Sequence, residues 1–103
     1  MSVYLHVTIE VTSAGFESFL AAMPQAVELL ERRAGWRLIG AYMQQTGRLY
    51  TVIDLWELQD MNHYDSGFKQ LAAAEFFPAF KAVIDQTVRN ETIVFAEKAP
   101  YMR

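Results

Sequence analysis

The stretch from Leu38 to Glu57 constrains the fold more than any other part of the chain, because it has the pattern of one β-hairpin. Two runs of alternating side chains, residues 36–45 and 48–58, flank a short polar segment that contains Gly47. A glycine at this point favours a type I turn closed by a left-handed glycine bulge. Each run has one aliphatic side and one aromatic and polar side, which predicts a sheet that is covered on both faces.

The turn fixes which residues pair across the hairpin. With Gln44 opposite Arg48, the predicted cross-strand pairs are Tyr42 with Tyr50, Gly40 with Val52, Leu38 with Asp54, and Trp36 with Trp56. The other side of the hairpin then carries Ile39, Ala41, Met43, Leu49, Thr51, Ile53 and Leu55. A two-residue turn would shift the pairing by one and separate the aromatic residues, and we favour the first register.

The rest of the chain supplies two further strands and the helices. Residues 3–11 alternate apolar and polar side chains, as a strand does, and an amphipathic helix follows and ends at Gly35. Asp60 is a good N-cap for a second helix. A break at residues 75–78 restarts a shorter helix, and residues 92–97 form the last strand.

The resulting order is strand, helix, strand, strand, helix, short helix, strand. It predicts an α+β fold of the ferredoxin-like type, in which a βαββαβ antiparallel sheet has its helices on one face. A length of 103 residues fits a single domain that spans residues 1–103.

The sheet face away from the helices is expected to be too apolar to remain in water. It would carry Tyr4, His6, Thr8, Glu10, Trp36, Leu38, Tyr42, Tyr50, Val52, Asp54 and Trp56. At about 25 cal/mol per Å² and roughly 150–250 Å² for each large aromatic side chain, burying this face would stabilise an assembly by several kcal/mol. We therefore expect a homodimer through the sheet face, with room for a pocket there.

The composition of the chain argues against several classes of function. The chain has no cysteine, which rules out disulfides, thiolate metal sites and a cysteine nucleophile and makes a cytoplasmic location the default. Its net charge is -3 and its Arg and Lys residues are scattered, so we expect no nucleic-acid partner. No apolar run has the length of a membrane span, and residues 1–10 lack the features of a signal peptide.

Three residues on the aromatic face are candidate catalytic bases, namely Asp54, His6 and Glu10. A carboxylate held among aromatic rings is partly desolvated, which raises its pKa and suits it to accept a proton from a phenol-like ligand. For Asp54 we favour a structural role, in which it binds an arginine, a hydroxyl or a backbone group across the dimer interface. For His6 we likewise favour a place in the interface.

The remaining candidates would line a ligand rather than react with it. The predicted substrate-binding residues are Tyr42, Tyr50, Trp36, Trp56 and His63. His63 has a simpler explanation as a residue near a helix N-terminus, exposed or hydrogen-bonded beside the cap. The two histidines lack the spacing of metal ligands, and no glycine loop for a nucleotide is present, so we expect neither a metal nor a cofactor.

The hairpin resembles that of the NIPSNAP proteins, within the dimeric α/β-barrel superfamily. The resemblance rests on residues 38–42, 46–49 and 52–56, which are similar to the family's glycine, turn glycine and Leu-Trp spacing. It implies two ferredoxin-like subunits whose sheets pack face to face. Relatives of this fold include cofactor-free quinone-forming monooxygenases, haem-degrading oxygenases, polyketide cyclases and proteins with no established reaction, so the fold does not settle the function.

The resemblance also suggests a haem site, which this chain matches only in part. The haem-degrading relatives use an asparagine on the first strand, a tryptophan late in the third strand and a histidine on the second helix. Trp56 and His63 lie in comparable segments, but the first strand has no asparagine.

We expect a homodimeric protein that binds a small aromatic or polyketide-like molecule without a metal, and the sequence leaves its catalytic activity open. One alternative is a cofactor-independent or haem-degrading monooxygenase of the antibiotic-biosynthesis type. A second alternative is a non-catalytic dimeric scaffold.

Overall fold

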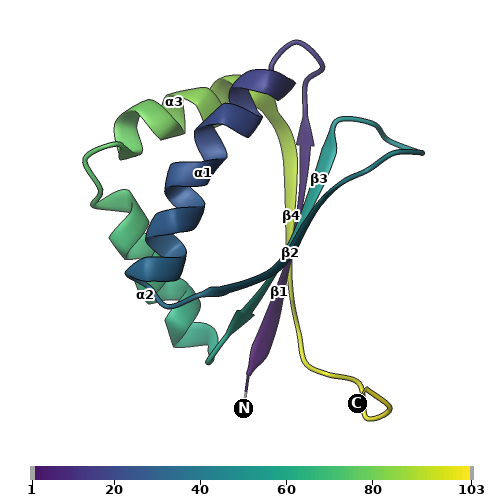
Figure 1. Cartoon of the computed structure of the whole chain (residues 1–103), viewed down its shortest axis with the longest axis vertical. Coiled ribbons are helices and arrows are strands. Elements are labelled where there is room, and N and C mark those ends of the chain that lie inside the picture. Colours follow the sequence, from purple (N-terminus) through teal and green to yellow (C-terminus); the bar gives the residue numbers. More distant parts are fainter. Residues whose placement is uncertain (1, 103) are drawn as a thin grey trace.

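The computed structural model describes residues 2–102, which form four strands and three helices. Their order is β1 (Val3–Val11), α1 (Phe16–Arg32), β2 (Arg37–Met43), β3 (Thr51–Leu58), α2 (Met61–Ala72), α3 (Phe77–Thr87) and β4 (Val88–Ala96). The strands form one antiparallel sheet in the order β2-β3-β1-β4. Figure 1 shows the helices together on one side of the sheet and the other side uncovered. The predicted α+β ferredoxin-like fold is therefore confirmed.

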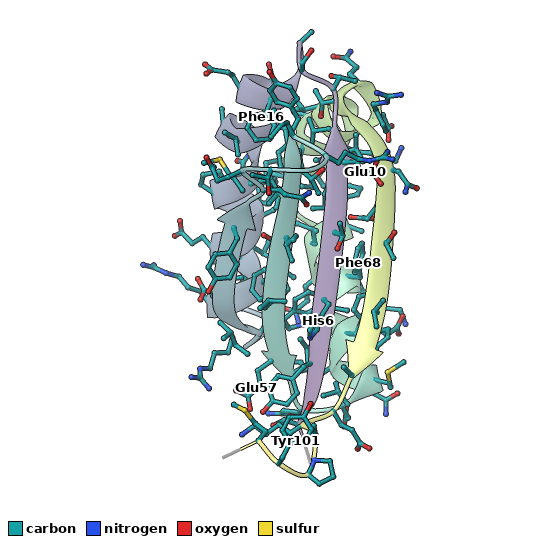
Figure 2. The ribbon with its side chains drawn as sticks, turned by 90° about the vertical axis from the view of Figure 1, so that its right-hand side faces the viewer. His6, Glu10, Phe16, Glu57, Phe68 and Tyr101 are labelled. Atoms are coloured by element: carbon teal, nitrogen blue, oxygen red, sulfur yellow. The ribbon has the colours of Figure 1, made fainter. Side chains whose placement is uncertain are left out.

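The central strand β1 has two chemically distinct sides, as predicted. Its alternation buries Leu5, Val7 and Ile9 beneath the helices. The opposite side carries Tyr4, His6, Thr8 and Glu10. We call the helix-covered side of the sheet the inner face and the uncovered side the open face. Figure 2 looks onto the open face, with His6 and Glu10 along β1.

The pairing of β2 with β3 shows that the predicted hairpin register is wrong. Tyr42 pairs with Ile53 and Met43 pairs with Val52, whereas the prediction placed Tyr42 opposite Tyr50. The observed partner of Tyr42, Ile53, is an odd number of residues away from the predicted partner, Tyr50. Successive side chains of a strand point to opposite faces, so an odd shift exchanges the two faces. The side chains of β3 therefore point to the faces opposite to those predicted, while Tyr42 stays on the open face.

The cause of this shift is the connection between the two strands. Residues 44–50 lie outside the paired strands, and a 2.9 Å hydrogen bond from the Gln44 backbone N–H to the Thr51 carbonyl closes them. Gly47 has the expected positive φ of 74°, but Tyr50 has a positive φ of 61° as well. Two left-handed positions make a wider loop than a type I turn with a single glycine bulge.

Three residues of β3 that were predicted on the open face consequently lie on the inner face. Val52, Asp54 and Trp56 are 6%, 5% and 3% exposed, respectively. They are aligned with Ile9, Val7 and Leu5 of β1, which the helices cover. Ile53 and Leu55, predicted to meet the helices, take their places on the open face.

Trp36, Leu38 and Tyr50 also lie elsewhere than predicted. Trp36 is 4% exposed within the core. Leu38 pairs with Trp56 and packs against the same core. Tyr50 lies in the loop after β2, where its ring makes an edge contact with Phe16 at 5.3 Å between centroids. None of the three belongs to the open face.

The ends of the helices follow the sequence signals in part. Asp60 caps α2 as predicted, since its Oδ1 accepts a 2.8 Å hydrogen bond from the His63 backbone N–H. Pro78 lies in the first turn of α3, where a missing N–H costs nothing. β4 begins at Val88, earlier than predicted, because its first residues pair with the end of β1 although they are mostly polar. No helix within residues 2–102 has the length and apolar content to cross a bilayer.

Candidate functional site

A cavity of about 260 Å³ lies between the inner face of the sheet and the helices. Apolar and aromatic side chains from β1, β3, β4 and all three helices form most of its lining. The polar groups of the lining are few and come from Asp54, Tyr64, Lys81, Asp85 and Glu91. A mostly apolar hollow with a few convergent polar groups is the usual form of a small-molecule site.

Asp54 is the buried acid of this cavity. It lies in the middle of β3, between Ala41 of β2 and Val7 of β1, and is 5% exposed. Within residues 2–102 its carboxylate has neither a hydrogen bond nor an ion pair. Burial, and secondly the charge of Glu91, raise the pKa of Asp54 to about 6. At neutral pH the group is therefore mostly ionised, yet it is more basic than an ordinary aspartate.

Trp36 organises the aromatic wall of the cavity. Its ring centroid lies 5.4 Å from that of Trp56 in an edge contact and 5.7 Å from that of Tyr64 in a stacked contact. Its indole N–H donates a 3.0 Å hydrogen bond to the His63 carbonyl, which satisfies the buried donor. Gly67 allows this close approach of α2, because a Cβ at that position would overlap the Trp36 indole. The two tryptophans thus contact each other on the inner face, but they are not the predicted cross-strand pair, because Leu38 is the residue that pairs with Trp56.

A second acid, Glu91, lies at the rim of the cavity. It is aligned with Ile9 on the inner side of β4, and it remains open to solvent. Loss of hydration raises the pKa of Glu91. The pKa of the Tyr64 phenol is raised by burial first and by the charge of Glu91 second. Asp54, Tyr64 and Glu91 therefore form one electrostatically linked group around the cavity.

His63 supports the wall of the cavity from outside. Its Nδ1 accepts a 3.0 Å hydrogen bond from the Gln59 backbone N–H, so the ring proton lies on Nε2, which donates to the Ala34 carbonyl at 2.5 Å. These contacts agree with the simpler of the two predictions for His63, that it is hydrogen-bonded beside the cap of α2 and does not line a ligand. Because both ring nitrogens are engaged, His63 does not fit the role of a haem ligand.

The other candidate bases, His6 and Glu10, lie on the open face, across the sheet from the cavity (Figure 2). Glu10 forms a 2.5 Å ion pair with Arg48 and accepts a 3.1 Å hydrogen bond from Asn90. These hydrogen bonds, that of Asn90 first, lower the pKa of Glu10. A carboxylate stabilised in this way is a poor proton acceptor. Tyr42 is also on the open face and is 58% exposed.

The fold therefore separates residues that the predicted register brought together. Trp36, Asp54 and Trp56 line the cavity. The remaining predicted site residues lie on the open face, in the loop after β2 or behind the cavity wall, and these are His6, Glu10, Tyr42, Tyr50 and His63.

The predicted site residues did not include Tyr64, Phe68 or Glu91, although all three line the cavity. Tyr64 and Phe68 belong to the apolar stripe of α2 and are indistinguishable in sequence from ordinary core residues. The sequence pattern could have indicated Glu91, because it alternates with Ile93 and Phe95. It therefore places an acid on a side of β4 that is otherwise apolar.

A second hollow, on the surface, is less suited to hold a ligand. It has a volume of about 630 Å³ and lies between α1 and the connection from α2 to α3. Its charged side chains, which include Arg33 and Glu75, are all exposed. No group of three metal-ligating side chains gathers anywhere in residues 2–102. We therefore take the inner cavity as the candidate site.

The fold and the cavity together define a class of protein, an α+β ferredoxin-like domain with a buried acid in an apolar cavity between sheet and helices. The NIPSNAP family model matches residues 6–101 of the chain. The chain therefore belongs to the NIPSNAP family, as its hairpin indicated. No curated protein matches the chain significantly.

Solved structures share this fold at low sequence identity. A NIPSNAP domain protein from Burkholderia xenovorans is 24% identical, with 100% of this chain and 99% of that chain covered and a TM-score of 0.78. A NIPSNAP family protein from Agrobacterium tumefaciens is 14% identical, with coverage of 98% and 89% and a TM-score of 0.85. A proposed antibiotic biosynthesis monooxygenase from Caulobacter crescentus is 13% identical, with coverage of 95% and 90% and a TM-score of 0.75. These likenesses concern the fold alone.

Proposed function

We propose that the protein binds a compact, largely apolar molecule in the inner cavity, with a hydrogen-bond donor of the ligand on Asp54. The supporting observation is that the residue Asp54 is 5% exposed and that its carboxylate lacks a partner within residues 2–102. An ionised carboxylate without a partner is costly in apolar surroundings, and a donor brought by a ligand offsets that cost. The cavity of about 260 Å³ is just below the roughly 300–1,000 Å³ of drug-sized sites. It suits a ligand of about one ring with a short substituent.

The same carboxylate suits an acid–base role in an enzyme. With a pKa of about 6, Asp54 is mostly ionised at neutral pH and is basic enough to accept a proton from an aromatic or polyketide-like ligand with a phenolic group. The fold is shared with a proposed antibiotic biosynthesis monooxygenase, which makes small-molecule chemistry a reasonable extension of binding.

A fragment screen on the wild-type protein and on Asp54→Leu tests the binding proposal. Phenol and benzyl alcohol should raise the melting temperature and shift the indole N–H signals of Trp36 and Trp56. Asp54→Leu preserves the size of the side chain but removes the acceptor. It should weaken binding at least about tenfold, because a hydrogen bond to a charged group contributes about 1.5–3 kcal/mol.

Glu31→Gln is the matched control, because Glu31 is an exposed acid of α1 outside the cavity lining. This variant should bind the fragments as the wild type does. If no fragment binds, or if Asp54→Leu binds every fragment as tightly as the wild type does, the proposal is wrong.

We also propose that two copies of the chain associate through their open faces. No layer formed by residues 2–102 covers this face (Figure 1). It carries partly or fully exposed apolar side chains from β2, β3 and β4, namely Tyr42, Ile53, Leu55 and Val94. The ion pairs Arg37–Glu57 and Arg48–Glu10 put both signs of charge on this face. A twofold-related copy can match such a surface with itself.

Light scattering coupled to size exclusion tests the association. The wild type should elute as a dimer at micromolar concentration, and Leu55→Arg should elute as a folded monomer, because it places an unpaired charge in the middle of the open face. Met61→Arg is the control, since Met61 is 55% exposed on α2, away from this face. A wild-type protein that is monomeric and folded would contradict the proposal.

A further inference from the structure

The charged groups around the inner cavity are out of balance. Among residues 2–102, the lining includes three acids, Asp54, Asp85 and Glu91, against one base, Lys81. The Lys81 ammonium lies 2.7 Å from the Asp85 carboxylate, one helical turn away on α3, so these two charges offset each other. When Asp54 and Glu91 are ionised, the lining carries uncompensated negative charge.

The aromatic side chains of the lining suit a cation. Trp36 stacks on Tyr64 with 5.7 Å between ring centroids, and the rings of Trp56 and Phe68 lie 5.4 and 6.5 Å from Trp36. All four rings line the cavity. The face of an aromatic ring attracts a cation within about 6 Å, and tryptophan does so most strongly. The cavity thus combines an acid that has no partner among residues 2–102 with the type of ring that best receives a positive charge.

We infer that the ligand of this cavity is an organic cation, a compact ammonium compound whose apolar body lies among the aromatic rings and whose nitrogen binds Asp54. This inference rests on the proposed function and names the class of its ligand. A protonated nitrogen supplies both a hydrogen-bond donor for the buried carboxylate and a positive charge for the acidic lining. An anionic ligand would meet Asp54 and Glu91, and the part of the lining formed by residues 2–102 offers no free cation to receive it.

The dependence of binding on pH distinguishes an ammonium ligand from a neutral one. An ammonium compound binds the ionised form of Asp54, so its affinity should fall as pH drops through the pKa of about 6. A neutral carbonyl compound would instead accept a hydrogen bond from the protonated acid, and its affinity would rise over the same range. For the amine, the expected loss between pH 7.5 and pH 5 is about tenfold, because only about one Asp54 in eleven is ionised one unit below its pKa.

The experiment uses three probes that share one ring, benzylamine, benzyl alcohol and benzoate, titrated into the wild-type protein at pH 7.5 by calorimetry. Benzylamine should bind at least about tenfold more tightly than benzyl alcohol, the ratio that 1.4 kcal/mol of charge interaction produces. Benzoate should bind more weakly than either. Cyclohexylmethylamine and cyclohexylmethanol provide a second matched pair and should show the same preference.

The outcomes separate this inference from the proposed function. If benzyl alcohol binds as tightly as benzylamine, or if benzylamine binds more tightly at pH 5, the ligand is not a cation, although the cavity still binds small molecules. If no probe binds, both the inference and the proposed function fall.

Two variants assign the preference to named acids. Asp54→Asn should bring the affinity ratio of benzylamine to benzyl alcohol close to one, and Glu91→Gln should lower it about threefold. Glu31→Gln removes the same charge from an exposed site and should leave the ratio unchanged. If Asp54→Asn does not fold, the pH titration of the wild type decides the question alone. A ratio that is unchanged in Asp54→Asn would overturn the assignment.

Discussion

The two faces of this sheet treat a carboxylate in opposite ways. On the open face, Glu10 is paired with Arg48 and hydrogen-bonded by Asn90, and its pKa is lowered. On the inner face, Asp54 has no partner within residues 2–102, and its pKa is raised to about 6. The first acid is stabilised by its own chain. The second is not stabilised by any described residue of its own chain, and this difference motivates the proposal that a ligand binds there.

The largest expected difference between the two faces is in stability, and neighbouring residues of β1 test it. Leu5→Ala removes a side chain that is 1% exposed and should lower the free energy of unfolding by about 2–5 kcal/mol. His6→Ala changes the next residue, on the open face, and should lower it by a smaller amount, because this side chain lies outside the core of its own chain. Urea denaturation at a fixed protein concentration measures both. Equal losses would mean that the two faces do not differ in burial as described.

The second difference between the faces is the sign with which the ionisation of each acid makes the stability of the fold depend on pH. The folded pKa of Asp54 lies above its unfolded value of 3.8, so its contribution to stability is fully present below that value and is lost as pH rises through about 6. The free energy of unfolding of the wild type, relative to that of Asp54→Asn, should fall by about 2 kcal/mol between pH 4 and pH 7. Urea denaturation at these two pH values measures the change.

Glu10→Gln is the natural control for this experiment, because the shift of Glu10 has the opposite sign. A lowered pKa gives a contribution that is present above the unfolded value of 4.5 and is lost as pH falls through the folded value. The stability of the wild type, relative to Glu10→Gln, should therefore rise with pH. Two curves with the same sign would remove the contrast between the faces.

The fold of this protein can be predicted from its sequence more reliably than the residues on each face of its sheet. The alternation of β1 predicted both of its sides correctly, because Leu5, Val7 and Ile9 are uniformly aliphatic while His6 and Glu10 between them are polar. The cap of α2 was equally clear. These features depend on local chemistry, and local chemistry is what a single sequence records well.

The side chains of β3 were assigned to the wrong faces of the sheet, because that assignment depends on the length of the loop between β2 and β3. Both of its alternating sets are largely apolar, so the strand alone does not tell which set meets the helices. Gly47 indicated a turn, but nothing local indicated that Tyr50 would adopt a second left-handed conformation and widen the loop. This one error moved Asp54 from an expected dimer interface to the inner cavity. The cavity itself was not predicted, because its lining also includes Tyr64, which belongs to a helix and not to the hairpin.

The smallest expected effect concerns a polar group that faces no cavity. Thr51 is aligned with Glu10 on the open-face side of β3, is 2% exposed, and its hydroxyl has no partner within residues 2–102. Thr51→Val replaces this hydroxyl with a methyl group of the same shape. It should raise the free energy of unfolding by about 1 kcal/mol, the lower end of the cost of a buried polar group without a hydrogen bond.

The binding of benzylamine should not change in Thr51→Val, because the hydroxyl lies across the sheet from Asp54. Denaturation and titration of the same sample measure both quantities. A gain in stability with unaltered binding would separate the hydroxyl of Thr51, which has no partner in residues 2–102 and only destabilises the fold, from the carboxylate of Asp54, for which we propose a ligand. A loss of stability would mean that the hydroxyl does have a hydrogen-bond partner in solution.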